Sequence, residues 1–152
     1  MIIAIVQARM GSKRLPGKIL KIIQHKPMLL HIIKRLECVK EIDKIVIATS
    51  DLKQDDLVEE MARKYGISCF RGSESDVLKR FHDTAVKFKV DHIIRITGDC
   101  PLVDPLIISK LIKLYFNGNY DYCAVACGAG VANEKQIKRF PDGLAIGRAS
   151  CR

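Results

Sequence analysis

The stretch that most constrains this chain is residues 2–18, where an apolar segment runs directly into a cationic loop. Five of residues 2–7 are apolar, which predicts a strand buried on both faces. The loop that follows contains two glycines, a proline and four cations, namely Arg9, Lys13, Arg14 and Lys18. Open α/β sheets bind ligands at the carboxyl ends of their strands. Because glycine permits close backbone approach and cations match phosphate oxygens, the stretch predicts a triphosphate site; the alternative is a basic surface turn.

The rest of the chain alternates between strand-like and helix-like segments. Strands are expected at residues 19–23, 44–49, 67–70, 92–97 and 120–126. Helices are expected from Pro27 to residue 36, from Asp55 and Asp56 to residue 64, after an N-cap at Ser73 to residue 88, and after an N-cap at Asp104 to residue 115. This order predicts an α/β fold with a mainly parallel sheet in three α/β/α layers. Residues 1–144 are expected to form the domain, and residues 145–152 a tail without regular structure.

One carboxylate follows the strand expected at residues 92–97. Asp99 lies in the sequence TGDCPL, at the same sheet edge as the cationic loop. Magnesium prefers one or two carboxylates together with phosphate oxygens and water, so Asp99 is the natural metal candidate. The alternative is a turn aspartate that binds its own backbone. Asp104 is explained by helix capping instead.

Composition narrows the classes of partner. The net charge of +9 fits an anionic ligand. The lysines are spread over the expected helices, and aromatic residues make up only 6% with no Trp, so a nucleic-acid surface is not expected. No apolar run approaches the roughly 20 residues of a membrane span, and the N-terminus does not resemble a signal peptide. The six cysteines show no C-x-x-C spacing, which favours reduced, buried thiols in a cytoplasmic protein.

The cationic loop, QARMGSKRLPGK at residues 7–18, resembles the signature loop of the nucleotide-sugar cytidylyltransferases. The nearest branch is the spore coat polysaccharide biosynthesis protein F type, which is similar to the CMP-Kdo and CMP-sialic acid synthetases. Residues 70–78 resemble the segment that lines the family's nucleotide pocket, and residues 95–105 its metal segment. Residues 140–144, FPDGL, match the start of a further motif. The fold implied is the nucleotide-diphospho-sugar transferase fold, which is GT-A-like and Rossmann-like.

The resemblance implies a cytoplasmic enzyme that couples CTP to a sugar acid with Mg²⁺ and releases pyrophosphate, in surface polysaccharide biosynthesis. A homodimer is possible. It implies catalytic roles for Arg9, Arg14, Lys18 and Asp99, with Asp99 as the metal ligand. Arg71 and Ser73 are the candidates for contacts to the base or ribose. The implied nucleotide-binding residues are Ala8, Arg9, Met10, Gly11, Ser12, Arg14, Lys18, Arg71, Ser73 and Asp99.

Two departures from the family pattern leave alternatives open. Ala145 stands where the family usually has an acidic residue, and family members continue well beyond this point. A nucleotide-binding remnant without turnover is therefore one alternative. A glycosyltransferase that uses a nucleotide sugar is another, although the chain lacks the D-x-D pair that such enzymes commonly use for their metal. A nucleic-acid-binding module is suggested only by the charge.

Overall fold

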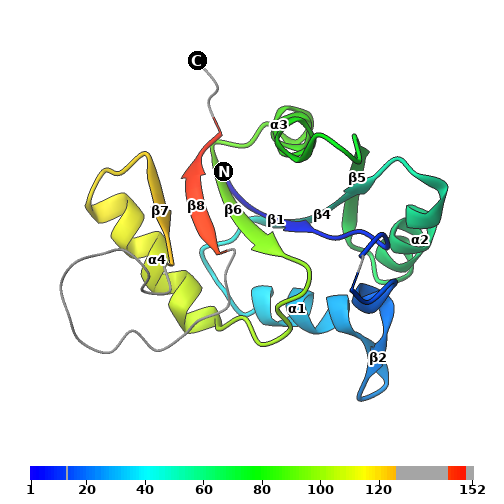
Figure 1. The fold of residues 1–152 in the computed structure, drawn as a ribbon. Coiled ribbons are helices and arrows are strands. Elements are labelled where there is room, and N and C mark those ends of the chain that lie inside the picture. The colour runs from blue at the N-terminus through cyan, green and yellow to red at the C-terminus, as the bar shows by residue number, and fades with distance from the viewer. Residues whose placement is uncertain (13, 126–143, 150–152) are drawn as a thin grey trace.

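The computed structural model describes residues 1–12, 14–125 and 144–149. These residues form a six-stranded sheet in the order β5-β4-β1-β6-β8-β7 (Figure 1). Its strands are β1 Ile2–Gln7, β4 Lys44–Ser50, β5 Ser68–Gly72, β6 His92–Thr97, β7 Tyr122–Ala124 and β8 Ala145–Arg148. The first four in this order are parallel, whereas β8 is antiparallel to both β6 and β7. The mainly parallel sheet is thus confirmed.

Helices cover both faces of the sheet and complete the three layers. They are α1 Met28–Leu36, α2 Asp56–Lys64, α3 Val77–Phe88 and α4 Pro105–Asn117. Figure 1 shows α1, α2 and α4 on one face and α3 on the other. None of these described helices combines the length and the apolar character that a membrane crossing requires.

Strand β1 lies in the middle of the sheet and is buried on both sides, which explains its uninterrupted apolar sequence. Ala4 and Val6 face the larger core, which the helices α1, α2 and α4 cover. Ile3 and Ile5 face the smaller core with Phe81 of α3. All four β1 side chains are fully buried. The strand that carries the cationic loop is therefore held by side chains on both faces of the sheet.

The expectation that residues 145–152 lack regular structure is wrong for Ala145–Arg148, which forms β8. This strand lies between β6 and β7, and Ile146 sits opposite both Ile94 and Cys123. The Ile146 side chain is fully buried in the larger core. A strand this short has no readable period of its own, because its pairing is decided by two neighbours distant in sequence.

Several expected boundaries differ in detail. Residues 18–27 form a short 3-10 helix, η1 Lys18–Leu20, and a hairpin of β2 Ile22–Ile23 with β3 Lys26–Pro27, instead of one short strand. Helix α3 is capped by Asp76, whose carboxylate accepts the Lys79 N–H at 2.8 Å, and not by Ser73. The expected cap at Asp104 is confirmed, because its carboxylate accepts the Leu106 N–H at 2.8 Å.

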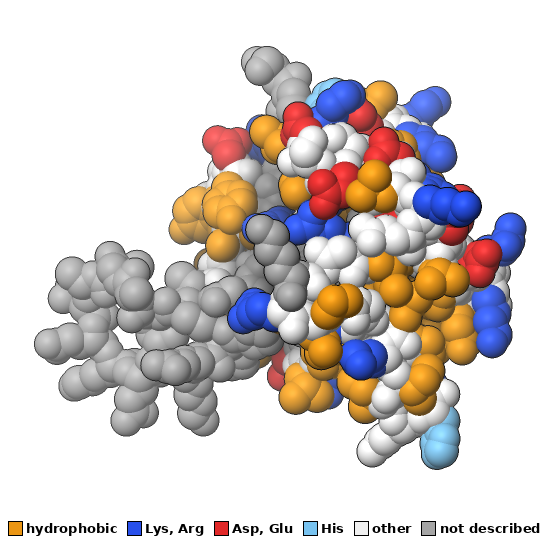
Figure 2. Space-filling model, turned by 45° about the vertical axis from the view of Figure 1, so that its right-hand side comes forward, with side chains coloured by type: hydrophobic (Ala, Val, Ile, Leu, Met, Phe, Trp, Pro, Cys, Tyr) orange, Lys and Arg blue, Asp and Glu red, His pale blue; other side chains and the backbone are white. Residues whose placement is uncertain are grey.

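Figure 2 shows how charged side chains are distributed over one face of the protein. On the face shown in Figure 2, Lys and Arg side chains are scattered among acidic and apolar ones and form no continuous stripe. The four cysteines in the described part of the chain, Cys38, Cys69, Cys100 and Cys123, are all free thiols. Cys38 is exposed and the other three are half-buried, so the prediction that the thiols are buried is wrong for Cys38 and only partly right for the others. Burial raises the pKa of the Cys69 thiol to about 11, so this group stays protonated at neutral pH.

Candidate active site

A cavity of about 380 Å³ opens at the carboxyl ends of β1 and β6. The first loop, residues 8–18, forms one wall and the turn after β6 forms the other, as the sequence predicted. The lining residues are Gln7, Ala8, Arg9, Gly11, Ser12, Arg14, Lys18, Ile19, Arg95, Thr97, Gly98 and Asp99. Four of them are cations and one is a carboxylate. A cavity of this charge suits an anionic ligand that carries several phosphate oxygens.

Lys18 and Asp99 form an ion pair across the cavity. The Lys18 Nζ lies 2.6 Å from the Asp99 Oδ2, so the start of η1 is joined to the turn after β6. The hydrogen bond from Lys18 lowers the pKa of the Asp99 carboxyl below its usual value, which keeps it ionised at neutral pH. The two residues that the sequence assigned to phosphate and to metal are therefore in direct contact.

The residues present fit a magnesium ion that is held mainly by its nucleotide. Asp99 is an ionised, half-exposed carboxylate that faces the cavity beside cations that match phosphate oxygens. Within the described ranges, no group of three or more His, Cys, Asp or Glu side chains comes together as a metal cage. Magnesium commonly takes one or two carboxylates and completes its shell with phosphates and water. One carboxylate at this position meets that pattern.

Gly98 allows β6 to approach β1 at the floor of the cavity. Its N–H donates to the Gln7 carbonyl at 2.8 Å. A Cβ at this position would lie 2.6 Å from the same carbonyl oxygen and 3.1 Å from the Ala8 Cβ. Because the first of these contacts is with backbone, no side-chain rotation relieves it. The close approach fixes where Asp99 leaves the strand.

We expect Gly98→Ala to lower the free energy of unfolding by about 1–3 kcal/mol, as overpacking of a tight contact does. Urea denaturation measures the effect. Gly147→Ala is the matched control, because a Cβ there meets its nearest atoms at an ordinary 3.4 Å. Equal stability of the two variants would contradict this account.

The first loop is folded around the backbone of Met10. The Met10 carbonyl accepts the Ser12 N–H at 2.8 Å and the Gly17 N–H at 3.0 Å. Gly17 has a φ of 67°, a left-handed conformation that glycine adopts without strain. These bonds draw the loop into a compact turn with Arg9, Gly11 and Ser12 on the cavity. Lys13 lies outside the described residues.

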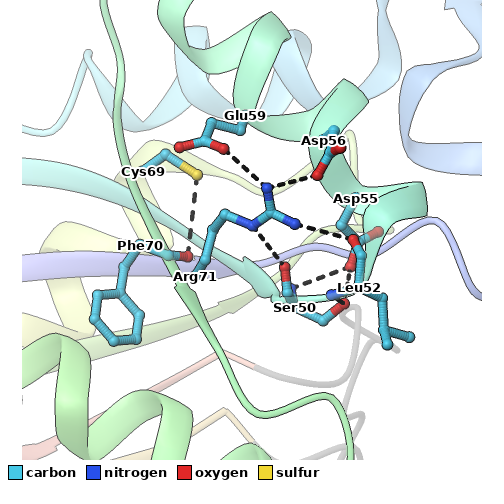
Figure 3. A network of polar contacts seen from close by, with 8 residues as sticks. All are labelled: Ser50, Leu52, Asp55, Asp56, Glu59, Cys69, Phe70 and Arg71. Atoms are coloured by element: carbon cyan, nitrogen blue, oxygen red, sulfur yellow. Dashed lines mark hydrogen bonds and ion pairs between the residues drawn. The ribbon is translucent and has the colours of Figure 1, made fainter.

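Arg71 does not reach the cavity. Its Nη1 lies 2.6 Å from Asp56 and 3.0 Å from Glu59, both in α2 (Figure 3). Its Nε and Nη2 donate to the carbonyls of Ser50 and Leu52 at 3.1 and 3.0 Å. All three guanidinium nitrogens are thus occupied by groups of the α2 side of the sheet. Arg71 therefore binds the α2 side of the sheet and does not line the cavity.

Ser73 also lies away from the cavity lining. Its hydroxyl accepts the Asp76 N–H at 3.0 Å, and its carbonyl accepts a bond from Arg80. The contact between this segment and the first loop is made by Glu74, whose carboxylate pairs with Arg9. The segment after β5 therefore approaches the site through Glu74 instead of Arg71 or Ser73.

The sequence assignment missed Arg95, which lines the cavity from β6. The alternation of side chains along β6 could have indicated it. Ile94 and Ile96 face the larger core, so Arg95 lies on the opposite face of the strand, the α3 face, together with Ile93. The Arg95 side chain makes no hydrogen bond or ion pair with another residue in the described ranges, and Ala145 stands opposite Arg95 in the register of β6 and β8. Arg95 also borders a second, mainly apolar cavity of about 480 Å³ over β6, β7 and β8.

Residues 140–143 of the FPDGL motif lie outside the described residues.

Comparison with known proteins agrees with this geometry. Residues 3–146 match the model of the cytidylyltransferase family. The chain is 42% identical over 125 residues to the spore coat polysaccharide biosynthesis protein SpsF of Bacillus subtilis, covering 80% of this chain and 52% of that protein. It is 31% identical over 137 residues to the 8-amino-3,8-dideoxy-manno-octulosonate cytidylyltransferase of Shewanella frigidimarina, covering 88% and 55%. The chain spans about half the length of these curated relatives.

Solved structures give the same result. A cytidylyltransferase from Leptospira borgpetersenii superimposes with a TM-score of 0.83 at 33% identity, covering 97% of this chain and 60% of that one. A CMP:2-keto-3-deoxy-manno-octonic acid synthetase in complex with CTP superimposes with a TM-score of 0.70 at 27% identity, covering 78% and 48%. The family match extends over nearly all of the described sheet, including the first loop and Asp99. This chain therefore belongs to the cytidylyltransferase family.

Proposed function

We propose that this protein binds CTP in the cavity between the first loop and the turn after β6, and transfers its cytidylyl group to a sugar acid. The observation that carries the proposal is the Lys18–Asp99 pair at 2.6 Å, placed in a cavity that Arg9 and Arg14 also line. A cation of the kind that binds phosphate and a carboxylate of the kind that binds Mg²⁺ therefore lie in the same cavity. The products would be a CMP-sugar and pyrophosphate.

In this reaction a hydroxyl oxygen of the sugar forms a bond to the α-phosphorus, and the bond from that phosphorus to pyrophosphate breaks. The hydroxyl proton passes to solvent or to a base. Negative charge develops on the phosphate oxygens and on the leaving group. Stabilisation of this charge by fixed cations is therefore the main catalytic effect. Arg14 and Lys18 hold the β- and γ-phosphates, and Arg9 holds the loop against Glu74. Holding the sugar hydroxyl and the α-phosphorus in line lowers the activation barrier further.

Asp99 would hold Mg²⁺ against the triphosphate, where the ion neutralises phosphate charge and polarises the α-phosphate. Lys18 binds one of the two Asp99 carboxylate oxygens, so the other oxygen would be open to the ion. The Lys18 ammonium lines the same cavity and would also be within reach of the phosphates. The ion pair thus holds both side chains in place before the nucleotide arrives, and it keeps Asp99 ionised.

The sugar acid is proposed from the relatives, one of which is named for 8-amino-3,8-dideoxy-manno-octulosonate and another for spore coat polysaccharide. A role in the synthesis of surface polysaccharide, in the cytoplasm, follows as part of the same proposal. Binding without turnover is the second candidate, and one observation favours it. Ala145 leaves Arg95 without a carboxylate opposite it, at a position where the family pattern has an acidic residue.

The test is pyrophosphate release from CTP and Mg²⁺ with a panel of sugar acids, with ATP, GTP and UTP as controls. We expect release only when CTP and a matching sugar acid are both present. Calorimetry of CTP binding is run beside it. Binding without release from any acid would support the second candidate. Release of CMP from a CMP-sugar, without pyrophosphate, would indicate a glycosyltransferase and overturn the proposal.

A further inference from the structure

Asp55 is a carboxylate with no exposed surface, and it lies where the first loop meets β4. It ends the short 3-10 helix η2, Lys53–Asp55, immediately before α2. Although it occupies the N-cap position of α2, its side chain makes no capping bond there. A buried carboxylate is costly unless donors satisfy its oxygens. The donors that do so show what the residue holds together.

One oxygen of Asp55 binds the first loop and the other binds the end of β4. Its Oδ1 accepts the Met10 N–H at 2.7 Å. Its Oδ2 accepts the Ser50 N–H at 3.1 Å and also the Ser50 hydroxyl. The carboxylate is thus a bridge between two chain segments that are separated by 40 residues or so in sequence.

Met10 is the residue around which the first loop is folded. Its carbonyl accepts the Ser12 and Gly17 N–H groups, so the position of the Met10 backbone fixes both limbs of the loop. The neighbouring residues Arg9 and Gly11 line the cavity. A shift at the Met10 amide would therefore be transmitted to the groups proposed to hold the triphosphate.

Asp55 is itself held from the other side. Ser50 donates twice to Asp55, and its carbonyl accepts a hydrogen bond from the Arg71 Nε at 3.1 Å. Arg71 is in turn fixed by Asp56 and Glu59 of α2 (Figure 3). A continuous set of hydrogen bonds therefore runs from α2 through Arg71, Ser50 and Asp55 to the Met10 amide.

We propose that Asp55 is a positioning residue for the nucleotide site, which acts by fixing the Met10 amide and with it the first loop. The inference rests on the proposed function, because it assumes that the loop binds CTP. In this proposal Arg71 does not contact the nucleotide. It supports the first loop indirectly, through Ser50 and Asp55. Asp55 itself lines no part of the cavity.

The test compares Asp55→Ala with Asp43→Ala. Asp43 is an exposed carboxylate that serves as a control at the opposite end of β1, where its Oδ2 accepts the Ile2 N–H at 2.7 Å. Each variant removes a carboxylate that binds a backbone amide next to the same strand. CTP affinity is measured by calorimetry under conditions where circular dichroism shows the variant to be fully folded. A purely structural role would lower stability without changing the affinity of the folded protein.

We expect Asp55→Ala to weaken CTP binding about tenfold or more, and Asp43→Ala to leave it within about twofold. Wild-type affinity in folded Asp55→Ala would overturn the inference. If the wild-type chain itself fails to bind CTP, the proposed function fails, which is a separate result.

If Asp55→Ala does not fold, a milder pair answers the same question. Ser50 and Thr49 are neighbours in β4 with fully buried hydroxyls, but only the Ser50 hydroxyl binds Asp55. We expect Ser50→Ala to weaken CTP binding about threefold or more, and Thr49→Val to leave it unchanged. Equal affinities of these two variants would overturn the inference.

Discussion

Replacing Asp99 with Asn should remove the gain in CTP affinity that Mg²⁺ confers. The amide keeps the size of the side chain but loses the charge that attracts the ion. The structure adds a second expectation, because Lys18 loses its partner at 2.6 Å and the cavity loses a negative charge. Metal-free CTP should therefore bind about as well as to the wild type, or better. In the presence of Mg²⁺ the affinity should be at least about tenfold below that of the wild type.

Calorimetric titration of CTP with and without Mg²⁺ measures both effects. Asp104→Asn is the control, since Asp104 caps α4 through the Leu106 N–H and Asn caps a helix about as well. That variant should keep the full response to the metal. A normal Mg²⁺ response in Asp99→Asn would show that Asp99 does not hold the ion.

Replacing Lys18 with Ala should weaken metal-free CTP binding more than any other single change in the first loop. It removes a charge-assisted bond, typically about 1.5–3 kcal/mol or roughly 10- to 150-fold in affinity, and also leaves Asp99 unpaired beside the phosphates. Arg14→Ala removes only the first contribution, so its loss should be smaller. Mg²⁺ should recover part of the Lys18→Ala loss, because the ion neutralises the unpaired carboxylate.

CMP separates triphosphate contacts from general damage to the loop. It lacks the β- and γ-phosphates, so both variants should bind CMP nearly as well as the wild type. Lys21→Ala is the matched control, since Lys21 is exposed and follows η1 outside the cavity lining. Equal losses for CTP and CMP would place Lys18 and Arg14 away from the pyrophosphate end.

Much of the fold was readable from the sequence because its elements carry their own periodic patterns. The apolar run of β1 reflects burial by α3 on one side and by the other helices on the opposite side. The cap at Asp104 is a local signal and is confirmed. Strand β8 was missed because Ala145–Arg148 has no pattern that distinguishes it from a loop, and β6 and β7 define it.

The difference between local patterns and contacts of distant segments also applies to the residues of the candidate site. Lys18 and Asp99 were assigned from the rule that strands of a parallel sheet end at one edge, and the structure brings them into contact. Arg71 follows the same rule, yet it points to α2, because strand alternation places it on that face. Asp55 looked like an ordinary residue at the start of a helix, and only the folded loop reveals its bond to Met10.

The position of β8 sets an order in which the sheet can be assembled during synthesis. Strands β1, β4, β5 and β6 with helices α1 to α3 are all complete by residue 97, so the parallel part of the sheet is synthesised before β7 and β8. Within the described sheet β7 pairs only with β8, which follows it in the chain. Until residue 148 has emerged, the β6 edge stays open and β7 has no neighbour. A nascent chain stalled between these points would present an unpaired strand edge, the kind of surface that chaperones cover and that promotes aggregation.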